Sequence, residues 1–284
     1  MSSEIHGPYG RAIEGRANRN SGASVENLAD PHAAVGFVFV SDESPGYLKA
    51  ATAGTRVTLP AFTPPWIVVH HAWEGVSVTS WPGRLFRVQV VPPTTDEERA
   101  AMARAAEGLA SHADYTRAIA VDLLEELSPS VLFGPHGDTV LRVIEAGSAL
   151  DEAGARALAS ARHPAAEREY GQAWHRWLAE QPEAAPYRNL DHAWTLAIPG
   201  AGPSRSPIGH GFSLIWKTVS ASARDRGSAG SLTLDEDGDE VLADPWETAL
   251  GALLDAAMAL GAPHLADRDA VTVLTAAWNT VFKP

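Results

Sequence analysis

The sequence predicts an α+β protein, in which an N-terminal antiparallel β region packs against a mainly α-helical C-terminal part that carries one inserted β-hairpin. Before residue 93, apolar and polar residues alternate with the period of two that is typical of half-buried strands. After it, helix caps and apolar residues at helical spacing predominate. The chain of 284 residues is 45% hydrophobic, which is enough apolar material for a sizeable core.

We expect three regions along the chain. Residues 1–34 are an irregular N-terminal arm, because Gly, Asn, Ser and Arg recur there without a period. Residues 35–93 are the β-rich region. Residues 94–284 are mainly helical, with a long Pro/Gly/Ser-rich loop at 181–211 and a β-hairpin at 231–242. Whether the regions form separate domains is left open by the sequence.

Three consecutive strands are expected at the centre of the β region, at Trp66–Trp73, Val76–Trp81 and Arg84–Val91. Pro82-Gly83 suits a type II turn, so the second and third strands are predicted to pair antiparallel. Earlier elements are expected as strands at Val35–Val40 and Thr55–Leu59 and a short helix at Tyr47–Ala53.

Helix caps divide the remainder of the chain. Thr95 and Glu98 form a capping box that opens a helix reaching about Ala110. Gly147 is expected to end a later helix in the left-handed conformation. Phe212–Ala223 is ambiguous between strand and helix, and its composition favours a strand. Asp151 is expected to cap a helix over residues 151–162, and Asp267 is expected to start a helix over residues 267–282. Further helices are expected over residues 112–127, 138–146, 164–180 and 244–260.

Composition excludes several function classes. The absence of cysteine removes disulfides, thiolate nucleophiles, zinc–thiolate sites and iron–sulfur clusters. No apolar run has the length of a membrane helix, so no membrane partner is expected. The N-terminus lacks the apolar segment of a secretory signal, which favours a cytoplasmic location.

The charge of the chain bears on its partners. Its net charge of −13 opposes a phosphate backbone, and the sequence contains no basic patch, so we predict no binding to nucleic acid. The expected partner is a small molecule, neutral or cationic, or a basic peptide. The oligomeric state is left open.

The most suggestive catalytic residues are His70 and Glu74. They share a face of the expected strand, so the carboxylate could orient the imidazole as a general base. His71 points to the opposite face. Arg84 or Arg87 would bind an anionic group of the substrate. The more frequent alternative is one histidine packed in the core and the other solvated.

Three further residues are candidates for substrate binding. Trp73 lies with Trp66 and Trp81 on the β region, where tryptophans can form a wall for a cation or a flat ligand, although core packing is the commoner role. His136 lies on a Gly/Pro loop before a helix, and His210 lies between two glycines. Loops of this kind carry function often, but both histidines also suit a purely structural loop.

No metal or cofactor is predicted. The chain lacks His-Glu-x-x-His and the glycine-rich motifs of nucleotide sites, and Asp235, Asp237 and Asp239 do not have the spacing of a calcium loop. Two functional classes remain. One is a metal-independent enzyme that acts on a small molecule or peptide by acid–base chemistry. The other is a non-enzymatic protein-binding module, of the adaptor or immunity type, that uses an acidic surface. A deep pocket with perturbed pKa values favours the first, and a broad shallow face favours the second.

Overall fold

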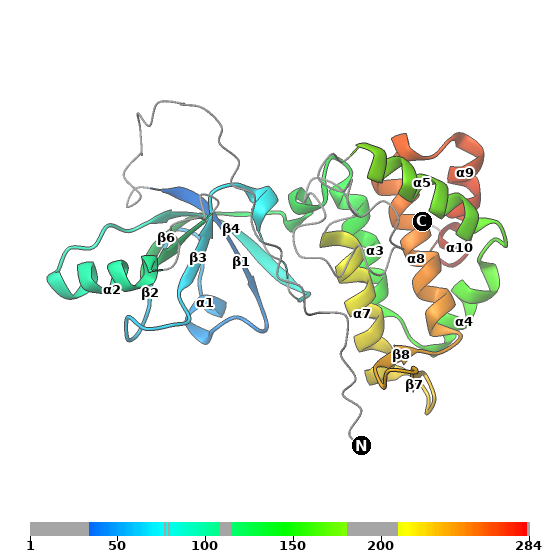
Figure 1. The fold of residues 1–284 in the computed structure, drawn as a ribbon, viewed down its shortest axis with the longest axis horizontal. Coiled ribbons are helices and arrows are strands. Elements are labelled where there is room, and N and C mark those ends of the chain that lie inside the picture. Colours follow the sequence, from blue (N-terminus) through cyan, green and yellow to red (C-terminus); the bar gives the residue numbers. More distant parts are fainter. Residues whose placement is uncertain (1–33, 77, 79, 108–114, 181–209, 283–284) are drawn as a thin grey trace, which may run out of the picture.

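The computed structural model describes residues 34–76, 78, 80–107, 115–180 and 210–282. An antiparallel sheet with helix α2 beside it forms one part, and a group of helices forms the other, as Figure 1 shows. This arrangement confirms the predicted α+β class.

Six strands form one antiparallel sheet in the order β2-β6-β4-β1-β3-β5. The chain therefore crosses the sheet repeatedly, and β1 and β4 lie at its centre. The strands are β1 (Val35–Ser41), β2 (Arg56–Thr58), β3 (Ile67–His70), β4 (Gly83–Val90), β5 (Tyr115–Ala118) and β6 (Ala120–Leu127). Strands predicted at Val35–Val40, Thr55–Leu59 and Arg84–Val91 are confirmed, and the predicted strand at Trp66–Trp73 is shorter as β3.

The two faces of the sheet bury different cores. Val38, Phe86 and Val88 lie on the face that packs with α1 (Gly46–Lys49) and α2 (Asp96–Ala106). On the opposite face, Phe37, Phe39, Leu85 and Leu127 contact the core of the helical part. Alternation along each strand thus supplies two apolar surfaces, as the period of two requires.

The predicted strand at Val76–Trp81 is wrong, because none of its described residues, 76, 78, 80 and 81, belongs to a strand. Strand β4 pairs with β1 on one side and β6 on the other, so it does not form a hairpin with the residues before it. Val76 and Val78 are buried in the core of the helical part. Their alternation with polar residues therefore reflects burial at the junction of the two parts and not pairing in a sheet.

The predicted helix at residues 112–127 is also wrong, because its described residues form β5 and β6. Ala, Leu and Glu favour helix, but tertiary contacts override that preference. Arginines on two neighbouring strands bind carboxylates on β6 in the pairs Arg56–Asp122, Arg84–Glu126 and Arg87–Glu125. Residues 108–114 lie outside the described residues, and the predicted helix end at Ala110 lies among them.

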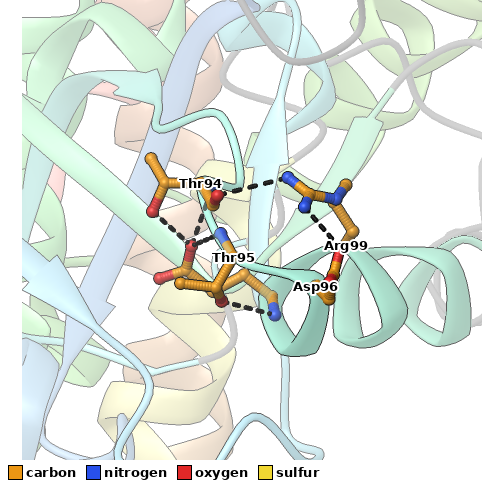
Figure 2. A network of polar contacts seen from close by, with 5 residues as sticks. Thr94, Thr95, Asp96 and Arg99 are labelled. Carbon is orange, nitrogen blue, oxygen red and sulfur yellow. Dashed lines mark hydrogen bonds and ion pairs between the residues drawn. The ribbon is translucent and has the colours of Figure 1, made fainter.

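The predicted capping box at the start of α2 is confirmed. The Thr95 hydroxyl accepts from the Glu98 amide at 3.1 Å, and a Glu98 carboxylate oxygen accepts from the Thr95 amide at 3.0 Å. The same oxygen accepts from the Thr94 amide, while Arg99 bonds the Thr94 carbonyl and the Asp96 carboxylate (Figure 2). These hydrogen bonds, led by the one from the Thr94 amide, lower the pKa of Glu98.

Replacing Thr95 by alanine is expected to lower the free energy of unfolding by about 1 kcal/mol, because the Glu98 amide loses its acceptor. Urea denaturation measures the change. The matched control is Thr272→Ala, since Thr272 bonds the Arg268 carbonyl inside α9 and caps nothing. Equal effects of the two substitutions would contradict a capping role.

The other helices of this part surround α8. Among the described residues, α8 contributes more buried residues to the core than any neighbouring helix does. Helices α3, α4, α5, α7, α9 and α10 all pack against or close to it (Figure 1). The elements are 3-10 helices η2 (Trp73–Gly75), η3 (Pro129–Phe133) and η5 (Pro263–Leu265), helices α3 (Gly137–Ala149), α4 (Glu152–Ala161), α5 (Ala166–Glu180), α7 (His210–Arg226), α8 (Trp246–Gly261), α9 (Arg268–Leu274) and α10 (Ala276–Val281), and the hairpin strands β7 (Leu232–Leu234) and β8 (Glu240–Leu242).

Helix α7 replaces the strand that composition favours at Phe212–Ala223. Phe212, Ile215 and Val219 are buried at intervals of three and four residues, so one face of the helix enters the core. Most of the long connection at 181–211 lies outside the described residues, which resume at His210.

The sequence predicts that Gly147 ends its helix, but this is wrong, because α3 continues to Ala149. A Cβ atom at Gly147 would lie 2.9 Å from the Thr218 hydroxyl oxygen, so the missing side chain lets α3 and α7 approach closely. The glycine therefore serves helix packing. Elsewhere the hairpin and the caps at Asp151 and Asp267 are confirmed.

Candidate small-molecule site

His70 lies at the end of β3, beside Phe37 of β1 and Tyr115 of β5. Its ring centroid is 6.0 Å from that of Tyr115. Burial, followed by the charge of His71, lowers the pKa of His70, so the imidazole is neutral near pH 7. Glu74 belongs to η2, but its side chain lies outside what the structure describes. Their role as an acid–base pair stays a prediction.

The two arginines predicted to bind substrate are engaged in ion pairs. Arg84 donates two hydrogen bonds to Glu126 and one to the Ala51 carbonyl. Arg87 bonds Glu125, and in the register of the sheet it lies two strands from His70, a distance of about 10 Å. The structure therefore does not bring these arginines together with His70.

The remaining predicted residues are dispersed. Trp73 packs against the core of the helical part. His136 is exposed at the N-cap position of α3 and makes no side-chain capping bond. His210 is the first residue of α7, and its side chain is not among those described. They stay predictions, and a different group of residues forms the best-defined site.

A cavity of about 660 Å³, which we call the α8 cavity, opens between α4, α5 and α8. Its size is in the range of small-molecule sites. The ionisable side chains that line it are four carboxylic acids, one arginine and one tyrosine: Glu167, Asp244, Glu247, Asp255, Arg162 and Tyr170. The cavity is thus strongly acidic.

A buried ion pair lies in the wall of the α8 cavity. Asp255 is 2% exposed, and one of its carboxylate oxygens accepts from Nε of Arg162 at 2.8 Å. Gly251 lies one turn before Asp255 on α8, and a Cβ atom there would lie 2.7 Å from the Arg162 guanidinium carbon. The glycine therefore leaves the space through which Arg162 crosses the helix to reach the carboxylate.

Burial raises the pKa of Asp255 from 3.8 to about 6, although hydrogen bonding to Arg162 acts in the opposite direction. Desolvation thus outweighs the attraction of the guanidinium, as is common for buried ion pairs. The carboxyl group of Asp255 therefore gains or loses its proton close to neutral pH.

Tyr170 supplies a second buried polar group to the cavity. Burial raises the pKa of its hydroxyl well above 10, and the negative charge of Asp255 adds to this effect. Its ring lies 6.0 Å from Phe212 and stacks at 6.5 Å on Trp174, which fixes its position. Tyr170 therefore stays protonated and presents a rigid aromatic surface.

The sequence contains a signal for this site. Asp255 is the single acid within Ala249–Leu260, an otherwise apolar run of α8. An acid on an almost entirely buried helix must find a partner or alter its pKa. The partner, Arg162, is 93 residues away along the chain, so the pair itself could not be predicted from spacing.

Comparison with known proteins gives no assignment: no family model, curated protein or solved structure matches the chain. Among the described residues, no group of histidines, aspartates and glutamates is arranged to hold a metal ion. Within that same set, no helix is both long and apolar enough to cross a membrane.

Proposed function

We propose that the protein binds a small organic cation in the α8 cavity and that Asp255 is the acid–base group of this site. The observation that carries the proposal is the buried Asp255–Arg162 pair in the wall of a cavity lined by further carboxylates. It belongs to the first of the two classes that the sequence leaves open, with a different set of residues.

Two physical arguments support a cationic ligand. The carboxylates lining the cavity outnumber its one arginine, and that arginine is already paired. A cation that enters the cavity therefore gains Coulomb attraction in surroundings of reduced dielectric constant. It also stabilises the ionised form of Asp255, which burial alone disfavours.

The proton affinity of Asp255 supports acid–base chemistry on such a ligand. General acid–base groups work best when their pKa is near the operating pH, and Asp255 has a pKa of about 6. Perturbed carboxyl groups in cavities are common features of functional sites. The alternative function, a non-enzymatic protein-binding module of the adaptor or immunity type that uses an acidic surface, stays a second prediction.

The test is calorimetric titration with three ligands of similar shape: benzylamine, benzyl alcohol and benzoate. We expect benzylamine to bind, with affinity falling as salt is added. Benzyl alcohol should bind about tenfold more weakly, and benzoate should not bind, because the cavity repels an anion. Equal affinity for all three ligands, or no binding of benzylamine, would contradict the proposal.

Two variants locate the binding. Gly171 lines the cavity, and a Cβ atom there would meet nothing within 4 Å, so Gly171→Met adds a flexible side chain at the cavity without a clash at its Cβ atom. Benzylamine binding should be lost in this variant and weakened in Glu247→Gln. The control is Glu236→Gln on the exposed hairpin tip, which should bind as the parent does. Full binding by Gly171→Met would place the ligand elsewhere.

A further inference from the structure

A second cavity, of about 580 Å³, lies where the sheet meets the helical part, and we call it the junction cavity. Its sheet side is formed by Ser80, Trp81 and Glu43. Its helical side is formed by α7 and by Ser148 near the end of α3. Sites between two packed parts of a protein are frequent places for ligands.

One face of α7 supplies most of the lining. The residues recur one turn apart, so they form a continuous stripe: Lys217, Thr218, Ala221, Ser222, Asp225 and Arg226. Ala221 is the small residue in the middle of this stripe and leaves room in front of it. The stripe carries charges of both signs.

Arg226 is fixed at the edge of the stripe by neutral acceptors. Its Nη2 donates to the Ser222 hydroxyl at 2.8 Å and to the Ser148 carbonyl. Ser222 in turn donates to the Gly147 carbonyl at 2.9 Å, which ties α7 to α3. No carboxylate of the described residues forms an ion pair with Arg226, so its charge is not neutralised there.

Two acids that line the cavity also carry charges that no ion pair among the described residues neutralises. Neither Glu43, on the turn after β1, nor Asp225, on α7, forms an ion pair with any cation in the described part of the chain. With Lys217 also in its lining, the junction cavity therefore presents both positive and negative groups. A ligand with a single charge would be attracted by one and repelled by the other.

Trp81 provides an apolar surface in the same cavity. Its ring stacks on Phe39 with centroids 6.5 Å apart and meets the edge of Phe133 at 6.4 Å. Both neighbours restrict the indole, and Trp81 is only partly buried. An aromatic surface held in this way favours a flat or apolar ligand group.

We infer that the junction cavity binds a small zwitterion of the amino-acid class, either a free amino acid or a short peptide with free termini. Arg226 pairs with the carboxylate, Glu43 and Asp225 pair with the ammonium group, and Trp81 contacts the side chain. This site is separate from the α8 cavity, and the two inferences do not depend on each other.

Calorimetric titration with three related probes tests this inference: alanyl-phenylalanine, its N-acetylated form and its C-terminal amide. The first has both charges, the second lacks the ammonium group and the third lacks the carboxylate. We expect the free dipeptide to bind, and each blocked form to bind about tenfold more weakly, which is the usual effect of losing one charge-assisted hydrogen bond.

Two variants assign each charge to its partner. Arg226→Gln keeps a donor for the Ser148 carbonyl, and it should bind the dipeptide and its amide equally. Glu43→Gln should reduce the preference for the free dipeptide over the acetylated form. The matched control is Arg224→Gln, since Arg224 lies on α7 outside the cavity and is paired with Glu240.

Occlusion of the cavity gives an independent readout. Ala221→Trp should abolish binding of the dipeptide while circular dichroism shows the parent helix content. Absence of dipeptide binding to the parent protein, equal affinity for all three probes, or unchanged discrimination in Arg226→Gln would each overturn the inference.

Discussion

Replacing Asp255 by asparagine is expected to raise the free energy of unfolding at pH 7 by about 3 kcal/mol. Burial raises the pKa of this carboxyl from 3.8 to about 6, and each unit corresponds to about 1.4 kcal/mol. Because the folded state favours the protonated acid, the stabilisation it provides is fully present below pH 3.8 and is lost as pH rises through 6. Asparagine resembles the protonated acid and loses nothing over this interval.

Urea denaturation between pH 4 and pH 7 measures this difference. The two proteins should be equally stable near pH 4 and diverge above it, because only the parent protein ionises a buried group. Asp237→Asn, on the exposed hairpin tip, is the control and should leave the profile unchanged. An asparagine variant that is less stable than the parent at pH 7 would show that the attraction of Arg162 stabilises the carboxylate by more than desolvation destabilises it.

A gain in stability from Asp255→Asn would bear directly on function. Residues of active and binding sites are often retained at some cost in stability, and their replacement then stabilises the fold while activity is lost. We therefore expect the same variant to lose benzylamine binding. Stability gained together with unchanged ligand binding would indicate a structural role for the pair.

Replacing Gly137 by alanine is expected to lower the free energy of unfolding by about 3 kcal/mol. Gly137 begins α3 shortly after η3 ends at Phe133, and an added Cβ atom would lie 1.8 Å from the carbonyl oxygen of Ser130. This neighbour is backbone, so the clash can be relieved only by moving η3 away from α3. The segment joins the sheet to the helical part.

Gly171 provides the matched control for Gly137, because it also lies in a helix but has nothing within 4 Å of an added Cβ atom. Gly171→Ala should raise stability by about 0.5 to 1 kcal/mol through helix propensity alone. Thermal unfolding of the two variants gives the comparison. Similar stability of Gly137→Ala and the parent protein would mean that the close contact with Ser130 is not required.

Much of the fold follows from local patterns in the sequence. The capping box at Thr95, the cap at Asp151 and the hairpin around Gly238 depend on neighbouring residues alone, and all are confirmed. The failures occur where distant contacts decide. Residues 115–127 have a composition suited to helix, but β6 pairs with β2 and β4, which come from an earlier part of the chain, and buries Val121 and Leu123.

The candidate site is harder to predict from the sequence than the fold is. The sequence indicates His70 and Glu74 because residues four apart on an expected strand share a face, whereas the α8 cavity is formed by residues that are remote in sequence. Asp255 could have been singled out as an acid on an apolar helix. Its partner Arg162 and the space above Gly251 depend on how the helices pack.

The most direct test of the account is a pH titration of the Asp255 carboxyl carbon by nuclear magnetic resonance, without ligand and with saturating benzylamine. We expect a pKa of about 6 in the free protein and a lower pKa in the complex, because a bound cation favours the carboxylate. A pKa that is unchanged at saturation would contradict binding of the cation beside Asp255, and a pKa near 3.8 in the free protein would contradict the conclusion that desolvation outweighs the attraction of Arg162.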